Sequence, residues 1–203
     1  MKAIVFDIDG TLIESMEVDT ELYFSSVSTV LGPVEFRPSL DDYEHVTDSG
    51  ILAQLLADND LAVNSGTIGR IRERFVAGLA EHIESTGPFP MIHGAGRFID
   101  ELRSSNEHGI AIATGGWKQS ALLKLGASGI DVQGIPMASC DDSHSRTEIM
   151  RVALAKLGTG FDSVTYFGDA EWDRRACRTL GWNFVAVGAA LNGIQSYAEI
   201  SIR

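Results

Sequence analysis

Short apolar segments, rich in residues that favour β-strands, recur along the chain and constrain its fold more than any other feature. The first, residues 2–6, stops at the sequence Asp-Ile-Asp-Gly-Thr, as a buried parallel strand that feeds a loop would. Further segments of this kind occupy residues 109–113, 135–139, 164–167 and 184–187. Helical patterns separate the later ones, at residues 118–125, 147–157 and 171–180. This alternation predicts an α/β fold, with a parallel sheet covered by helices on both faces.

The stretch from residue 15 to residue 86 breaks that alternation. It offers amphipathic helical patterns in place of strands, and its clearest helical face comprises Ile68, Ile71, Phe75, Leu79 and Ile83. We therefore predict a catalytic core formed by residues 1–14 and 87–203, interrupted by a helical cap at residues 15–86. Ser15 and the Pro-rich residues 86–90 would be the two hinges.

Composition narrows the classes of partner. A chain of 203 residues that is 44% hydrophobic can bury a core and carry one sizeable insertion. Its formal charge of −12 repels polyanions, so we expect neither nucleic acid nor an anionic membrane as partner. Apolar runs fall short of the roughly 20 residues of a membrane span. Cys140 and Cys177 lie far apart without a partner motif, which favours reduced thiols and a cytoplasmic protein.

Residues suited to chemistry follow the predicted strands. These segments are Asp7-Ile8-Asp9-Gly10-Thr11, then Ala113-Thr114-Gly115-Gly116, then Ser145-Arg146-Thr147, and last Gly168-Asp169 with Asp173 beyond it. The loops at the carboxyl ends of parallel strands converge on one crevice. We therefore expect these side chains to share a site.

Together, and in this order, the segments resemble the haloacid dehalogenase-like superfamily, and within it the capped enzymes similar to phosphoglycolate phosphatase and β-phosphoglucomutase. The resemblance covers nearly the whole chain and implies a Rossmann-like core that uses Mg²⁺. It implies that Asp7 is the nucleophile and Asp9 the general acid and base. It also implies that Thr114, Gly115 and Arg146 hold the phosphoryl group. The metal ligands would be Asp7, Asp169 and the backbone carbonyl of Asp9.

Elementary electrostatics supports these roles. A carboxylate can accept a phosphoryl group, which splits a slow hydrolysis into two steps. Two unit charges about 4 Å apart repel by roughly 4 kcal/mol at an effective dielectric near 20, so Asp7 needs a cation beside it. Mg²⁺ prefers hard oxygen ligands. Asp9 can reach the leaving-group oxygen, where general acid catalysis contributes about 10²–10⁴-fold. Asp173, one helical turn beyond Asp169, would orient metal-bound water or Arg146.

The third segment departs from the pattern of the superfamily, which most often presents a lysine there. Arg146 keeps the positive charge but has a larger, planar group. Lys118, just after the second segment, is the rival phosphate-binding cation. We favour Arg146, because it opens a predicted helix after the third strand.

The polar loop at residues 45–50 contains candidates for substrate specificity. In capped relatives such a loop reaches the active site, which makes His45, Thr47 and Asp48 candidates. The alternative is that Thr47 or Asp48 caps the helix that begins near Gly50.

These expectations define a Mg²⁺-dependent phosphatase that acts on a small phosphorylated metabolite as a monomer or weak homodimer. A phosphomutase would share every core residue and remains an alternative. A 2-haloacid dehalogenase is less favoured because it ordinarily lacks an acid at the position of Asp9, and a non-catalytic phosphate-binding scaffold would not need these carboxylates. A phosphonate hydrolase would need a lysine in the cap, and residues 15–86 contain none.

Overall fold

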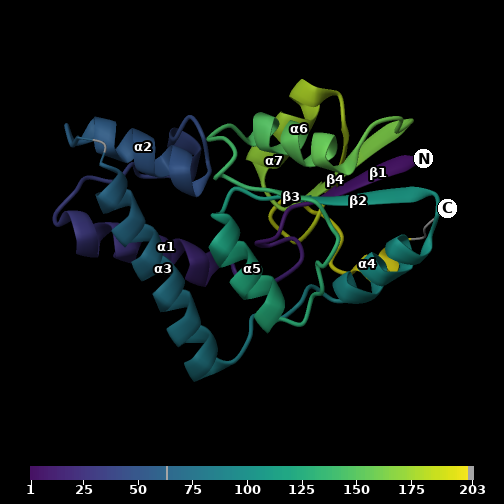
Figure 1. The fold of residues 1–203 in the computed structure, drawn as a ribbon, viewed down its shortest axis with the longest axis horizontal. Coiled ribbons are helices and arrows are strands. Elements are labelled where there is room, and N and C mark those ends of the chain that lie inside the picture. Colours follow the sequence, from purple (N-terminus) through teal and green to yellow (C-terminus); the bar gives the residue numbers. More distant parts are fainter. Residues whose placement is uncertain (63, 201–203) are drawn as a thin grey trace.

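A five-stranded parallel sheet forms the centre of the molecule in the computed structural model, which describes residues 1–62 and 64–200 (Figure 1). The strands are β1 (Lys2–Phe6), β2 (His108–Ala113), β3 (Met137–Ala138), β4 (Ser163–Gly168) and β5 (Asn183–Ala186). Their order is β3-β2-β1-β4-β5, so the first strand of the chain lies in the middle. The predicted α/β fold with a parallel sheet is confirmed.

Helices cover both faces of this sheet. On one face lie α6 (Arg146–Leu157) and α7 (Glu171–Leu180), and on the other lies α4 (Ala95–Ser104), with α5 (Lys118–Ala127) beside it (Figure 1). Residues 3–6 of β1 are buried, as expected of a central strand between two helical layers. The apolar β-formers that predict this strand are therefore its core residues.

The third strand is shorter than the sequence predicts. Only Met137 and Ala138 of the expected residues 135–139 form a strand. Pro136 has no N–H to donate to a ladder, although its carbonyl accepts a hydrogen bond from the Ile112 amide at 2.9 Å. The strand lies at the edge of the sheet, where proline is tolerated.

Residues 15–62 and 64–86 form a helical segment beside the sheet, on the left of Figure 1. It contains α1 (Met16–Leu31), the 3₁₀ helix η1 (Leu40–Asp42), α2 (Asp48–Asp58) and α3 (Ser65–Thr86). α1 packs against α3, and α3 packs against α5. Among the described residues, none of the helices combines the length and apolar character that a membrane crossing requires.

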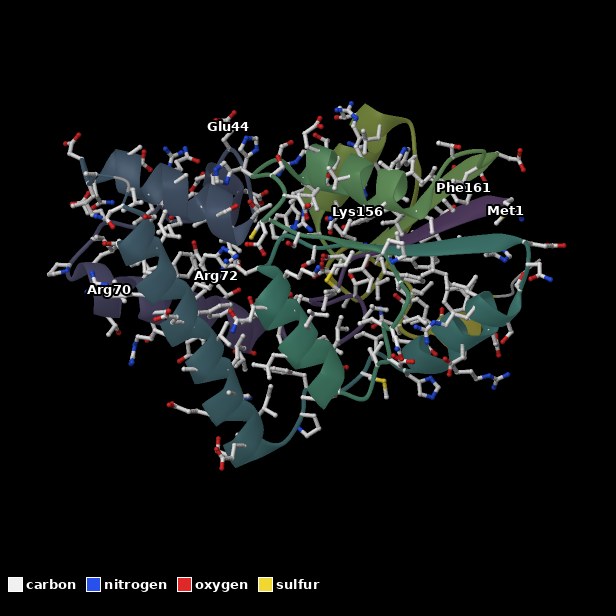
Figure 2. The ribbon with its side chains drawn as sticks, viewed as in Figure 1. Met1, Glu44, Arg70, Arg72, Lys156 and Phe161 are labelled. Atoms are coloured by element: carbon white, nitrogen blue, oxygen red, sulfur yellow. The ribbon has the colours of Figure 1, made fainter. Side chains whose placement is uncertain are left out.

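Aromatic and charged contacts join this segment to the helices of the sheet. Trp117, which precedes α5, packs against Phe75 of α3 with ring centroids 5.8 Å apart. Arg72 of α3, labelled in Figure 2, lies over the Trp117 ring at 5.3 Å and forms an ion pair with Asp141. The segment is thus held against α5 and the loop after β3.

Candidate active site

The loops that follow β1, β2 and β4 meet at the carboxyl end of the sheet, because β1 lies between the other two strands. The Asp7 amide, at the end of β1, donates to the Phe167 carbonyl of β4 at 3.0 Å. A cavity of about 60 Å³ opens there, lined by Asp7, Asp9 and Thr114 of the core. Thr47 and Asp48 of the helical segment close it from the other side.

Three carboxylates form a cluster that reaches the cavity through Asp7. Asp7, Asp169 and Asp173 each offer an oxygen, and these atoms lie within 4.8 Å of one another. Burial raises the pKa of Asp7 well above its usual range, and the charges of Asp173 and Asp169 act in the same direction. Burial, reinforced by Asp173, raises the pKa of Asp169 to about 7. Such a concentration of negative charge is stable only with protons or a cation among the oxygens.

The donor set fits a hard divalent cation. Asp169 Oδ1 and Asp173 Oδ2 are buried and have no hydrogen-bond partner among the described residues. Unpartnered buried carboxylate oxygens are costly, and oxygen ligands are those that Mg²⁺ prefers. The resemblance puts the backbone carbonyl of Asp9 on the metal and Asp173 beside it. In the structure the Asp173 side chain joins the carboxylate cluster, and the backbone contact of Asp9 stays a prediction.

Gly10 brings the first loop close to Asp169. Its φ of +73° is a conformation that residues with a Cβ rarely adopt. A Cβ at this position would also collide with the Asp169 carboxylate. The turn after Asp9 therefore requires glycine for two reasons, one conformational and one steric.

Arg146, the first residue of α6, reaches the carboxylate cluster. Its Nη1 lies 3.2 Å from Asp7 Oδ1, and its Nε lies 3.5 Å from Asp173 Oδ1. Lys118, the rival cation, is exposed and does not line the cavity. The reason is its position on α5, whose buried face comprises Ser120, Ala121, Lys124 and Leu125. The structure therefore brings Arg146 to this site and leaves Lys118 outside it.

Thr114 and Gly115 form the wall next to Arg146. The Thr114 side chain is buried, and its hydroxyl accepts a hydrogen bond from the Gly116 amide at 3.1 Å. That hydroxyl can donate its own proton to an oxygen in the cavity. Gly115 lies so close to the guanidinium that a Cβ there would come within 2.7 Å of Arg146 Nη2. This wall therefore offers donors for a bound oxyanion.

Lys124 is a site residue that the sequence analysis missed. Its side chain on α5 is fully buried, and its Nζ lies 2.5 Å from Asp9 Oδ1 and also pairs with Asp19 of α1. Ser15 donates to the same oxygen of Asp9. Burial alone would lower the pKa of Lys124, but Asp19 and Asp9 outweigh it and raise that pKa, so the amine stays charged. Burial raises the pKa of Asp19 to about 6, and Lys124 opposes that shift.

The predicted specificity loop lies against the second strand-end loop of the core. The Asp48 amide donates to the Gly115 carbonyl at 2.9 Å, and Asp48 Oδ2 accepts from the Trp117 amide at 2.9 Å. Burial, followed by the charge of Asp19, raises the pKa of Asp48 to about 8. Thr47 lines the cavity and also caps α2, accepting from the Gly50 amide at 3.1 Å. His45 is partly exposed and lies in an adjoining groove, outside the enclosed cavity.

Carboxylates and an arginine gathered at the strand ends of a parallel sheet can bind a metal ion and an anionic group of a substrate. A sequence model of the haloacid dehalogenase-like hydrolases matches residues 1–181. The chain therefore belongs to the haloacid dehalogenase-like hydrolase family, as the resemblance of its motifs predicts. A search of curated proteins gave no match.

Solved structures share the fold at low sequence identity. A hydrolase from Pseudomonas syringae is 20% identical, with a TM-score of 0.71 over 92% of this chain and 84% of that one. CbbY from Rhodobacter sphaeroides, solved in complex with phosphate, is 22% identical, with a TM-score of 0.70 over 96% and 88%. β-Phosphoglucomutase from Clostridium difficile is 15% identical, with a TM-score of 0.70 over 94% and 86%.

Proposed function

We propose that this hydrolase is a Mg²⁺-dependent phosphatase that cleaves small phosphate monoesters through a phosphorylated Asp7. The observation that carries this proposal is the convergence of Asp7, Asp169 and Asp173 within 4.8 Å, with the Arg146 guanidinium 3.2 Å from Asp7. A buried nucleophile, two further acidic oxygens and one cation are the groups that phosphoryl transfer to a carboxylate needs.

The first step is attack of an Asp7 oxygen on phosphorus. A bond forms from that oxygen to phosphorus, and the bond from phosphorus to the ester oxygen breaks. Asp9, which lines the same cavity, gives its proton to the departing alkoxide, so that an alcohol leaves. In the second step Asp9 takes a proton from water as the water attacks the acyl phosphate, which returns the Asp7 carboxylate and releases phosphate.

The other residues of the site would bind the metal ion, stabilise the phosphoryl group and orient Asp9. Asp7, Asp169 and Asp173 would hold the magnesium ion, whose charge offsets the repulsion between the Asp7 carboxylate and a phosphate dianion. Arg146, with the Thr114 hydroxyl and the amides of the Gly115 loop, would stabilise the negative charge on the transferring oxygens. Lys124 and Ser15 would keep the Asp9 carboxyl beside the leaving group.

The test is turnover of a panel of phosphate monoesters by the Asp7→Asn variant. Loss of the nucleophile should lower kcat by at least about 10³-fold. Asp100→Asn, the same change at an exposed position of α4, should leave kcat unchanged. Quenched wild-type enzyme should carry one added phosphoryl group by mass spectrometry, and the Asp7→Asn variant none. A correctly folded wild-type protein that hydrolyses no ester in the presence of Mg²⁺ would refute the proposal.

A further inference from the structure

The cavity holds positive charge only where the phosphoryl group would bind. Of the described residues that line it, Arg146 is the single cationic side chain, and it already faces Asp7. Lys124 lies behind the wall, fully buried and paired with Asp9 and Asp19. The part of the cavity left for the alcohol portion of a substrate therefore lacks a cation.

The helical segment makes this remaining wall acidic and apolar. Its ionisable residues are Asp19 and Asp48, and its apolar surface comes from Met16, Phe24 and Ile51. A second anionic group on the substrate would lose its hydration here, and the described residues that line the cavity offer it no cation other than Arg146. A hydroxyl group, in contrast, can donate to the carboxyl oxygens that line the wall.

The groove that adjoins the cavity contains one further arginine among its described residues, and this arginine is paired with a protein carboxylate. A wider groove of about 440 Å³ adjoins the site and shares Val46, Arg146 and Trp172 with it. Arg175 lines that groove, and its Nη2 lies 2.9 Å from Asp41 Oδ1 of η1. This pair reaches across from α7 to the helical segment at the surface, where its side chains are 52% and 58% exposed, and Arg175 does not line the cavity. A short substrate held by Asp7 would meet the acidic wall instead.

We infer that the site selects phosphate monoesters with a short, uncharged, hydroxyl-bearing leaving group and rejects substrates that carry a second anionic group. This inference rests on the proposed phosphatase function and adds the substrate class to it. Of the substrate types that the motif resemblance implies, it disfavours glycolate-type phosphates. It also disfavours the phosphomutase alternative, because transfer of a phosphoryl group to a sugar phosphate produces a bisphosphate, whose second phosphate would need a cation in this part of the cavity.

The test compares substrates that differ in one charge. 2-Hydroxyethyl phosphate and 2-phosphoglycolate have nearly the same size, and the first carries a hydroxymethyl group where the second carries a carboxylate. With Mg²⁺ present, we expect kcat/KM to be at least tenfold higher for 2-hydroxyethyl phosphate. Glycerol 3-phosphate against 3-phosphoglycerate provides a second pair with the same expectation. Equal or higher kcat/KM for the carboxylates would overturn the inference while leaving the phosphatase function intact.

Failure of the proposed function gives a different result. In that case neither member of either pair, nor p-nitrophenyl phosphate, is hydrolysed, and both proposals fall together. p-Nitrophenyl phosphate serves as the reference because its good leaving group makes little demand on acid catalysis by Asp9.

A gain-of-function variant separates charge from shape. Thr20 of α1 lines the cavity, and the only hydrogen bond of its hydroxyl among the described residues is a weak contact to the Met16 sulfur at 3.8 Å. Thr20→Lys should raise the ratio of kcat/KM for 2-phosphoglycolate over 2-hydroxyethyl phosphate at least tenfold. Thr20→Met, of similar length without the charge, should leave that ratio unchanged. A folded Thr20→Lys enzyme with an unaltered ratio would show that charge does not govern selection and would overturn the inference.

Discussion

Two groups of carboxylates meet at this cavity, one through Asp7 and the other through Asp9 and Asp19, and their negative charge is balanced in different ways. The open cluster comprises Asp7, Asp169 and Asp173, which have two unpartnered buried oxygens among them. The lysine cluster comprises Asp9, Asp19 and Lys124, in which one buried amine pairs with both carboxylates. The open cluster also has Arg146 beside it, but one guanidinium does not offset three carboxylates.

The difference indicates a division of labour. A group that must approach a phosphate dianion needs a cation that can also bind the substrate, so its counter-charge comes from outside the protein. A group that must only move a proton needs fixed geometry, and an internal lysine supplies it. Under the proposed function, the same residue type, aspartate, would serve in one cluster as a metal ligand and in the other as an oriented acid.

Removal of the lysine gives the largest expected change in stability. Lys124→Met leaves the Asp9 and Asp19 carboxylates buried without a counter-charge, which should lower the free energy of unfolding by about 3–5 kcal/mol. Denaturant titration measures this. Lys156→Met is the matched control, because Lys156, labelled in Figure 2, forms a partly exposed pair with Asp142. That change should cost no more than about 1 kcal/mol. Equal losses in the two variants would remove the distinction between the clusters.

Substitution of Arg146 tests whether this residue is the protein cation that binds the phosphoryl group. Arg146→Ala should lower kcat/KM by about 10²–10³-fold, because it removes a charged donor aimed at the transferring phosphoryl group. Lys118→Ala, at the exposed start of α5, should keep kcat/KM within twofold, or about 0.4 kcal/mol. The reverse pattern in steady-state kinetics would assign the phosphate to Lys118.

Magnesium should stabilise the open cluster and leave the lysine cluster unaffected. Free Mg²⁺ at a hundred times its dissociation constant should raise the free energy of unfolding by about 2.7 kcal/mol. Asp169→Asn should abolish this gain, whereas Asp19→Asn should retain it. Thermal denaturation with and without Mg²⁺ measures the difference. Loss of the stabilisation by Mg²⁺ in both variants would contradict the assignment of the metal ion to the open cluster alone.

The last effect is expressed per pH unit and concerns Asp48, which lies beside the lysine cluster. Its pKa of about 8 exceeds the value of 3.8 for an unfolded aspartate, so the folded protein retains a proton that the unfolded chain has lost. The contribution of Asp48 to the free energy of unfolding is greatest below the unfolded pKa of 3.8. It declines as the pH rises to about 8, by at most about 1.4 kcal/mol per pH unit. Asp48→Asn should remove this part of the decline in denaturant titrations at pH 5–9. An unchanged pH slope would contradict the assignment.

Much of the fold follows from local sequence, because a central parallel strand must be apolar on both faces. The apolar residues 2–6 predict β1 for this reason. The helical patterns at residues 147–157 and 171–180 match α6 and α7 within one residue at each end. Asp7, Thr114 and Arg146 could also be predicted as one site, because each follows a strand of the same sheet. Topology alone brings them together.

Lys124 could not be found in this way. It lies among leucines on α5, where a lysine usually marks the exposed face, yet Lys124 is buried and the neighbouring Leu122 is 43% exposed. Its partner Asp9 lies 115 residues away in sequence, so no local pattern connects the two. The packing of α5 against α3, together with the pairing of Lys124 with Asp19 of α1, decides which residue is inside, and both depend on distant segments.

The central place of β1 has a consequence for biosynthesis. Within this sequence β1 is translated before both of its neighbours, which are β2, ending at residue 113, and β4, ending at residue 168. At about 5–20 residues per second, the nascent apolar segment waits roughly ten to thirty seconds for its second neighbour. Throughout that interval an aggregation-prone edge is exposed. The arrangement that brings the loops of the site together therefore also leaves β1 without its second neighbour until residue 168 has been translated.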